Sequence, residues 1–314
     1  MSPSQATVIA PATTANLGPG FDVFGLALKH PHDKITLATI PVGIEVEASG
    51  FSEQHLPPLP KRSTASMVAE CITEEFNLKT GFKIEIDRGI MPGMGLGSSA
   101  ATATAVAYGI NRMFNLNLNN KELVRLAAKG ETASAGYAHA DNVAAAIYGG
   151  FIIVRSYNPL EIVSIKPPTD LEVCAAYPHV PTSARKTAIA RSVVPKQVPM
   201  EKVVHNVGSA SAMAAGFASR DIDLIGASMS DVVVEHERAA LIPGYRKVKD
   251  AALKAGACGV AISGAGPAMI ALINKRKTEA SKVAEAMKGA FESTGFKASA
   301  FATSPGKGIH VSEM

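Results

Sequence analysis

Met91-Pro-Gly-Met-Gly-Leu-Gly-Ser-Ser-Ala-Ala101 is the stretch that decides how the rest of this sequence is interpreted. It follows an alternating apolar segment, residues 82–86, which predicts a strand, and it leads into an Ala-rich run, residues 100–113, which predicts a helix. Three glycines at every second position let the backbone approach a large anion, because they carry no Cβ. The two serines then open the helix, where unpaired N–H groups and the positive end of the helix dipole favour phosphate. The stretch therefore predicts a phosphate-binding loop, and with it a nucleotide.

Other glycine-rich loops differ from this one in spacing. A dinucleotide fingerprint needs G-x-G-x-x-G, whereas here the third glycine comes one residue early, and a Walker A loop needs a lysine, which does not occur between Arg88 and Arg112. A nucleophile elbow needs G-x-S-x-G, which this stretch does not contain. The structural alternative is a turn that only packs a helix closely on a sheet. The residues assigned to the nucleotide are Pro92, Gly93, Met94, Gly95, Leu96, Gly97, Ser98 and Ser99.

Composition is that of an ordinary globular protein. The 314 residues are 47% hydrophobic and 18% charged, with a formal net charge of +4, and they suffice for one large or two medium domains. The densest basic clusters are Lys61-Arg62, Arg185-Lys186 and Lys275-Arg276-Lys277, and no aromatic residue is interleaved with them. These clusters are predicted to be solvated turns, so we expect no nucleic-acid partner.

The three cysteines match no metal or redox spacing, which predicts reduced thiols and a cytoplasmic protein. The polar start of the chain shows no signal peptide. Residues 89–111 lack charge, but Pro92 and five glycines interrupt them, so they do not form a continuous apolar membrane helix. We expect no membrane partner.

Strand and helix patterns alternate along the whole chain, which predicts an α+β fold. Ser63 and Thr64 are predicted to cap a helix after a Pro-rich connection. The other predicted strands are residues 6–10, 34–40, 44–48, 151–155, 172–177, 259–263 and 269–273. The other predicted helices are residues 121–130, 201–218, 231–241, 245–255 and 278–291.

Three blocks of the sequence together resemble the GHMP kinases, named for galactokinase, homoserine, mevalonate and phosphomevalonate kinases. They are Pro11-Ala-Thr-Thr-Ala-Asn-Leu-Gly-Pro-Gly-Phe-Asp22, the Gly-Leu-Gly-Ser-Ser loop and Ser263-Gly-Ala-Gly-Pro267. Within that superfamily the chain is most similar to the homoserine kinases. The Asn16-Leu-Gly-Pro-Gly-Phe-Asp22 part of the first block carries this closer resemblance, together with His139-Ala-Asp-Asn-Val143, Ala190-Arg-Ser-Val-Val-Pro195 and Arg238-Ala-Ala-Leu-Ile-Pro-Gly244.

The resemblance implies a two-domain fold with ATP and substrate between the domains. It places a ribosomal-protein-like N-terminal domain over residues 1–160 and a ferredoxin-like C-terminal domain over residues 161–314. It also implies ATP-dependent phosphorylation of the side-chain hydroxyl of L-homoserine, giving O-phospho-L-homoserine for threonine synthesis. Similarity to the family puts Glu131 and Ser99 on Mg²⁺, which suits a hard cation that binds oxygen ligands. A homodimer is a further family-level expectation.

Homoserine carries an ammonium, a carboxylate and the hydroxyl that accepts the phosphate. Asp22 suits the ammonium, with Asn16 as a nearby hydrogen-bonding group, although both residue types also form Asx-turns in glycine-rich loops. Arg191 and Arg238 suit the carboxylate through fork-like pairing. Thr187, four residues before Arg191, is a weaker candidate.

The resemblance implies that four more residues lie near the substrate or the transferred phosphate. His139, Asp141 and Asn142 are expected near the transferred group, with Asn142 positioning the hydroxyl and the role of Asp141 left open. Gly264 is expected to contact the substrate. The adenine-side helix starts with Ser63-Thr64 where the family commonly has an asparagine, and residue 145 is alanine where it commonly has proline.

Two other functions remain at this point. A GHMP kinase for a mevalonate-like or amino-alcohol substrate would not need the guanidinium pair, which an α-amino acid carboxylate explains better. A catalytically silent nucleotide-binding regulator would have no need of the metal set, and the presence of Ser99, Glu131 and Asp141 argues against it.

Overall fold

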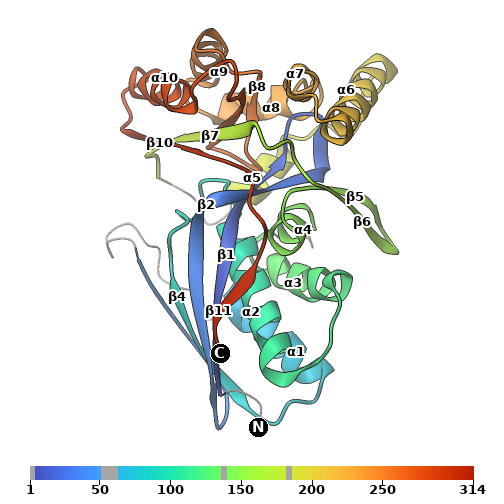
Figure 1. Cartoon of the computed structure of the whole chain (residues 1–314), viewed down its shortest axis with the longest axis vertical. Helices are drawn as coiled ribbons and strands as arrows, with labels where there is room; N and C mark the ends of the chain where they lie inside the picture. Colours follow the sequence, from blue (N-terminus) through green and yellow to red (C-terminus); the bar gives the residue numbers. More distant parts are fainter. Residues whose placement is uncertain (1–3, 51–62, 136–139, 182–185) are drawn as a thin grey trace.

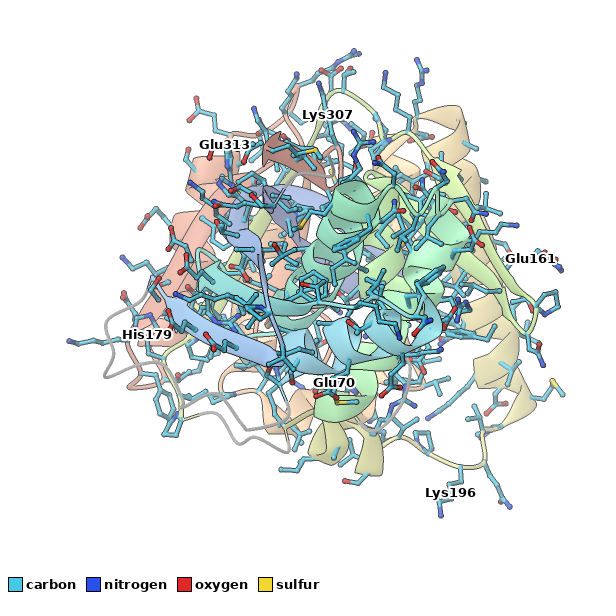
Figure 2. The ribbon with its side chains drawn as sticks, turned by 90° about the horizontal axis from the view of Figure 1, so that it is seen from below. Glu70, Glu161, His179, Lys196, Lys307 and Glu313 are labelled. Atoms are coloured by element: carbon cyan, nitrogen blue, oxygen red, sulfur yellow. The ribbon has the colours of Figure 1, made fainter. Side chains whose placement is uncertain are left out.

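The structure is a computed structural model that describes residues 4–50, 63–135, 140–181 and 186–314, with the side chains of residues 131–135 outside the description. Two layers of helices and sheets stack along the long axis, and both termini lie at the lower end (Figure 1). Charged side chains such as Glu161, Lys196 and Lys307 point outward from the ribbon (Figure 2). None of the helices in the described ranges is long and apolar enough to cross a membrane.

Strands from both ends of the chain build the first sheet. Their bounds are β1 Gln5–Asn16, β2 Gly20–Ile40, β3 Ile44–Ser49, β4 Gly81–Asp87, β5 Phe151–Tyr157, β6 Leu160–Ile165 and β11 His310–Glu313. Over the described residues they form a seven-stranded sheet in the order β11-β1-β2-β4-β3, and β5 pairs with β2 and β6. The predicted strands at residues 6–10 and 34–40 are confirmed, but each is part of a longer strand. The Pro11–Asp22 block therefore lies mostly in strands around a tight turn.

Helices cover one face of this sheet (Figure 1). Their bounds are α1 Thr64–Glu75, α2 Ser98–Phe114, α3 Asn120–Ala135 and α4 Asp141–Tyr148. Helix α2 is buried on nearly all sides, because it contacts β1 and β2 as well as α1, α3 and α4. Small side chains make this possible, and a Cβ at Gly109 would lie 2.6 Å from Leu37 Cδ1. The Ala-rich run after the glycines is therefore the central helix of the domain.

The second sheet consists of β7 Leu171–Pro178, β8 Gly259–Ile262, β9 Met269–Asn274 and β10 Ala298–Thr303, in the antiparallel order β10-β7-β9-β8. Helices α9 Tyr245–Lys254 and α10 Ala280–Glu292 pack on one face, where Val248 and Phe291 are buried. The remaining helical segments are α5 Lys186–Ser192, α6 Met200–Ser219, α7 Ile222–Ala227, α8 Glu235–Arg238 and η2 Ala239–Leu241.

Alternate residues of β7 face two different layers, as expected for a strand buried on both sides. Cys174 packs with α9 and α10, whereas Val173 belongs to the core that includes the first sheet, α6 and α7. The core of the first domain therefore continues beneath the second sheet. Strand β6 pairs with β5 in the first sheet, and β11 returns to pair with β1. A domain boundary after residue 160 stays a prediction.

The predicted helix at residues 231–241 is wrong at its beginning. The carboxylate of Asp231 accepts hydrogen bonds from the backbone N–H groups of Val233, Val234 and Glu235, so a turn forms first and α8 starts only at Glu235.

The predicted cap of α1 is confirmed, because Ser63 and Ser66 form a reciprocal capping box. Cys71, Cys174 and Cys258 carry free thiols.

A stacked aromatic pair joins the first sheet to α6. The rings of Phe151 and Phe217 lie 3.8 Å apart at an interplanar angle of 6°, and both side chains are fully buried. Phe217→Ala should therefore lower the free energy of unfolding by about 3–5 kcal/mol, as large-to-small substitutions of buried aromatics do. Urea unfolding measures this loss. Val42→Ala, at an 82% exposed position, should change stability by less than about 0.5 kcal/mol. Equal stability of the two variants would contradict this packing.

Candidate active site

The glycine loop, residues 91–97, joins the end of β4 to the start of α2. Gly93, Gly95 and Gly97 have φ angles of 78°, 91° and 71°, in the left-handed region that glycine occupies without steric cost. Gly97 is the N-cap residue of α2. The predicted strand–loop–helix junction is confirmed.

The glycines of this loop lie against other parts of the protein. A Cβ at Gly95 would meet the carbonyl oxygens of Ser263 and Gly266, and a Cβ at Gly97 would meet the side chain of Thr13. The glycines are thus required for close contact between chain segments, which is the packing role that the sequence left as the alternative. Close approach of this backbone to phosphate stays a prediction.

The loop is interlocked with a turn of the second domain, residues 263–267. Ala268 N–H donates to Met94 O at 2.9 Å, and Ser263 Oγ donates to Gly95 O at 2.7 Å. Thr13 N–H donates to Leu96 O at 3.0 Å. The loop carbonyls are therefore held by the protein. Within the described ranges, the N–H groups of Gly93 and Gly95 donate to no protein acceptor, so they are available to an anion.

A buried ion pair lies behind the loop. Asp33 Oδ1 accepts the backbone N–H groups of Gly89 and Ile90 at 3.0 and 2.8 Å. Arg88 lies 3.7 Å from Asp33 Oδ2 and donates to Ser98 Oγ at 3.0 Å. Burial raises the pKa of Asp33 to about 6, against the lowering effect of these partners. This pair ties the beginning of the loop to the first turn of α2.

Opposite charges gather next to the loop. Arg191 of α5 donates to Asp22 Oδ2 at 2.6 Å. Arg238 of α8 is 5% exposed and donates to Ala190 O at 2.9 Å and Gly264 O at 3.0 Å. The guanidinium carbons of Arg191 and Arg238 lie 5.4 and 4.9 Å from the centre of the Phe21 ring, so this aromatic face supports both cations. The three segments that carry Phe21 with Asp22, Arg191 and Arg238 are far apart in sequence.

Asn16 and Asp22 stabilise the turn between β1 and β2, in which they lie. Both have positive φ angles, 74° and 59°. Asn16 Nδ2 donates to Gly264 O at 2.9 Å, and Asn16 Oδ1 accepts the N–H of Asp22 at 3.1 Å. Tyr157 OH donates to the backbone oxygen of Asp22 at 2.7 Å. Asn16 thus links the first domain to the 263–267 turn, in addition to any contact with a substrate.

The beginning of α4 lies on the same side. Thr13 Oγ1 donates to Asn142 Oδ1 at 2.8 Å, which fixes the orientation of that amide. Asp141 Oδ1 accepts the N–H of Asn142 at 2.7 Å. Burial, followed by the charge of Asp22, raises the pKa of Asp141 to about 6. Such perturbed carboxyl groups gather at functional sites.

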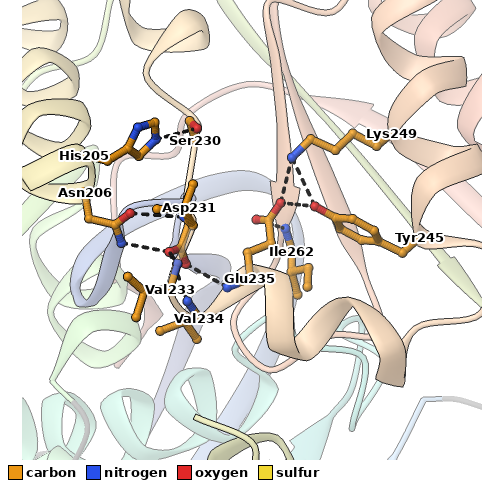
Figure 3. A network of polar contacts seen from close by, with 11 residues as sticks. His205, Asn206, Ser230, Asp231, Val233, Val234, Glu235, Tyr245, Lys249 and Ile262 are labelled. Carbon is orange, nitrogen blue, oxygen red and sulfur yellow. Dashed lines mark hydrogen bonds and ion pairs between the residues drawn. The ribbon is translucent and has the colours of Figure 1, made fainter. Parts of the chain in front are cut away.

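A polar network around Glu235 connects helix α8 to the end of strand β8 (Figure 3). Glu235, one helical turn before Arg238, is 5% exposed and accepts from Lys249 Nζ at 2.8 Å, Ile262 N–H at 3.1 Å and Tyr245 OH. Ile262 directly precedes the turn. Helix α8, which carries Arg238, is therefore linked to strand β8, and this network was not predicted from the sequence.

Comparison with known proteins identifies the family. The profile of the GHMP kinases N-terminal domain matches residues 63–150, and that of the GHMP kinases C-terminal domain matches residues 213–293. Homoserine kinase of Methanococcus vannielii is 44% identical over 273 residues, which cover 86% of this chain and 88% of that protein. The chain belongs to the GHMP kinase family.

Two further relatives extend this result over the whole chain. Homoserine kinase of Halorubrum lacusprofundi is 43% identical over 309 residues, covering 98% of this GHMP kinase and all (100%) of the relative. The crystal structure of homoserine kinase from Cytophaga hutchinsonii has a TM-score of 0.90 at 36% identity and covers 99% of this chain and 98% of its own. The expected two-domain α+β fold is confirmed.

The predicted site residues of this GHMP kinase fall into three groups. Those that the structure brings together around the glycine loop and the 263–267 turn are Asn16, Asp22, Pro92, Gly93, Met94, Gly95, Leu96, Gly97, Ser98, Asp141, Asn142, Arg191, Arg238 and Gly264. Thr187 lies in α5 with Arg191, while Ser63 and Ser99 lie at the starts of α1 and α2. The side chain of Glu131, and all of His139, lie outside the described residues.

The predicted metal ligands are only partly described. Ser99 Oγ lies 3.0 Å from Thr64 Oγ1, so its hydroxyl is at the junction of α1 and α2. No group of three or more His, Cys, Asp or Glu side chains that could hold an ion occurs in the described ranges. Mg²⁺ commonly needs only one or two protein oxygens besides phosphate, so a hydroxyl and a carboxylate fit it.

Sequence analysis missed several residues that support the site. Thr13, Phe21 and Arg88 lie in or beside the motif blocks, and their type suggested no specific partner. Lys186 was assigned to a solvated basic turn, which is wrong: its ammonium donates to Gly93 O at 2.5 Å and to Gly266 O. Arg185 lies outside the described residues.

The raised pKa of Asp141 leads to a stability prediction. Because the folded-state pKa is about 6 and the reference value is 3.8, the folded chain binds more protons between these values, and stability is lost as pH rises through them. Asp141→Asn removes this charge and should stabilise the protein at pH 7.5 by roughly 1–3 kcal/mol. Urea unfolding should show a smaller advantage at pH 5. An advantage that grows toward pH 5 would refute the assigned burial of the charged carboxylate.

Proposed function

We propose that this GHMP kinase transfers the terminal phosphate of ATP to the side-chain hydroxyl of L-homoserine, giving O-phospho-L-homoserine. The observation that carries the proposal is the group of Asp22, Arg191 and Arg238 beside the glycine loop. An α-amino acid presents an ammonium and a carboxylate at fixed separation, and one carboxylate with two guanidinium groups complements both charges. The homoserine kinase names of the relatives support the same substrate.

Nucleotide binding is assigned to the glycine loop and the start of α2. The N–H groups of the loop and the positive end of the α2 dipole would receive the phosphates, while Ser63 at the start of α1 is the candidate on the adenine side. Ser99 and Glu131 would hold Mg²⁺ against the phosphates. When bound, Mg²⁺ neutralises charge that develops on the transferred group.

Asn142 is assigned to the acceptor hydroxyl. Thr13 fixes its Oδ1, which leaves Nδ2 as the group that can donate to the homoserine oxygen; Nδ2 itself lies 3.4 Å from Asp141 Oδ1. Asp141, with its pKa near 6, is able to hold or release a proton close to neutral pH. Whether the hydroxyl proton passes to Asp141 or to phosphate distinguishes two mechanisms for the same site.

A GHMP kinase for another acceptor is the second candidate. The test is ADP release with ATP and Mg²⁺ and, in turn, homoserine, mevalonate, shikimate and galactose. The proposal expects kcat/KM for homoserine to exceed every other value by at least about 10²-fold, because the other acceptors leave the guanidinium pair without an amino-acid carboxylate. Release of ADP with none of the four acceptors would favour a nucleotide-binding regulator.

Arg191 provides the sharper test of substrate identity. Arg191→Ala removes a charged hydrogen-bonding group, and Asp22 can then hydrate because its side chain is 29% exposed. We expect kcat/KM for homoserine to fall roughly 10- to 150-fold, with KM for ATP changed less than about 2-fold. Arg155→Ala, which removes an exposed arginine paired with Glu161, is the matched control. An equal loss for ATP and homoserine would assign Arg191 to the phosphate side.

Glu131 tests the metal assignment. Glu131→Gln keeps the size of the side chain and removes its charge, so kcat should fall by on the order of 10²-fold or more and require higher Mg²⁺. Glu122→Gln in the same helix is the control, because Glu122 accepts the N–H of Asn119 at 2.8 Å and an amide oxygen can do the same. Near-wild-type kcat for Glu131→Gln at ordinary Mg²⁺ would remove Glu131 from the site.

A further inference from the structure

Lys186 joins the two segments that build the nucleotide side of the site. It is the first residue of α5, and its Nζ donates to Gly93 O in the glycine loop at 2.5 Å and to Gly266 O in the 263–267 turn. The same loop and turn meet through Ser263 and Ala268. A single ammonium thus bridges parts of both domains, on the loop whose N–H groups are expected to receive the phosphates.

The environment of this ammonium is unusual. No carboxylate of the described residues forms an ion pair with Lys186. The charged group that acts on it is Arg238 of α8, which has the same sign, while the loop and the turn present neutral carbonyl oxygens. Burial, and then Arg238, lower the pKa of Lys186 to about 7. A partly buried cation that no carboxylate of the described residues pairs with is costly, and a group perturbed in this way is a candidate for a functional site.

The glycine loop also lacks something that phosphate-binding loops commonly contain. No lysine occurs between Arg88 and Arg112, whereas a Walker A loop carries its own lysine to the phosphates. Among the loop's neighbours, Arg88 is already engaged with Asp33 and Ser98 on the far side. We propose that Lys186 supplies the loop with this missing ammonium: bound phosphate holds Lys186 protonated, and the ammonium holds the glycine loop against the 263–267 turn.

This inference rests on the proposed function only in requiring a bound nucleotide. It has a thermodynamic consequence, because negative phosphate raises the pKa of a nearby ammonium. With its pKa lowered to about 7, Lys186 should be mostly neutral at pH 8 when no nucleotide is bound. Nucleotide binding at pH 8 should therefore be accompanied by the uptake of about one proton per binding site. The affinity of the wild type should weaken as pH rises from 7 to 9.

Calorimetry of ADP binding at pH 8, with Mg²⁺ and in two buffers of different ionisation enthalpy, measures this uptake. Lys186→Met should abolish the Lys186 share of the uptake and weaken ADP binding roughly 10- to 100-fold. Adenosine, which has no phosphate, should bind both proteins equally. Lys196→Met is the matched control, because Lys196 is exposed, extends away from the ribbon (Figure 2) and should leave both quantities unchanged.

A second measurement needs no nucleotide. The unfolded chain binds more protons than the folded one between pH 7 and the ordinary lysine pKa of 10.5, so Lys186 destabilises the wild type most at or below pH 7. Urea unfolding should show Lys186→Met gaining stability over the wild type at pH 6, with a smaller gain at pH 9.

Equal ADP affinity and equal proton uptake in wild type and Lys186→Met would overturn the proposal. So would an equal loss of adenosine and ADP affinity, which indicates a structural role only. If Lys186→Met does not fold, a pH-independent ADP affinity of the wild type between pH 7 and 9 overturns it alone. A wild type that binds no nucleotide would instead refute the proposed function.

Discussion

The contact between the glycine loop and the 263–267 turn is the constraint on which the rest of the site depends. Ser263 and Ala268 donate hydrogen bonds to the carbonyl oxygens of Gly95 and Met94, respectively. The absence of a Cβ at Gly95 allows the two segments to come this close. On one surface the loop carbonyls accept hydrogen bonds from the protein, and on another the N–H groups of Gly93 and Gly95 donate to no acceptor among the described residues. Burying a backbone polar group without a partner is costly, so this division of carbonyls and amides fixes which side of the loop can accept an anion. Two domains that are separate in sequence thus build the single surface to which we assign the nucleotide.

The substrate side is held to the same turn. Gly264 O accepts from both Asn16 and Arg238, and Glu235 connects the helix of Arg238 to the strand that precedes the turn. Arg191 and Lys186 stand at opposite ends of the short helix α5, one paired with Asp22 and the other with the loop. The proposed homoserine and nucleotide sites are therefore joined by hydrogen bonds. If both sites are as proposed, this connection sets the separation between the acceptor hydroxyl and the phosphate, and such positioning is a main contribution of a kinase to its reaction.

Local patterns sufficed to predict the elements that carry the site. The alternation at residues 82–86, the glycines and the Ala-rich run predicted β4, the loop and α2, and the charges of Asp22, Arg191 and Arg238 indicated an amino-acid substrate through the family resemblance. Long-range partners could not be predicted in this way. The carbonyls that bind Lys186 belong to residues 93 and 266, and Gly95 faces Ser263, so no local window contains both members of either pair. The beginning of the 231–241 segment was mistaken because Asp231 caps a turn there, and apolar periodicity does not detect a side chain that competes with the helix.

Hydrogen exchange of individual amides, with and without a non-hydrolysable ATP analogue, tests the central claim most directly. The claim is that the glycine loop and the 263–267 turn form one preassembled nucleotide surface. Without ligand, the amides of Thr13, Gly264 and Ala268, which donate to Leu96 O, Ala15 O and Met94 O, should exchange as slowly as those of the central strands. The analogue should then slow the amides of Gly93 and Gly95, which have no protein acceptor in the described ranges. Fast exchange at Ala268 without ligand, or an analogue that leaves the loop amides unchanged, would contradict the account.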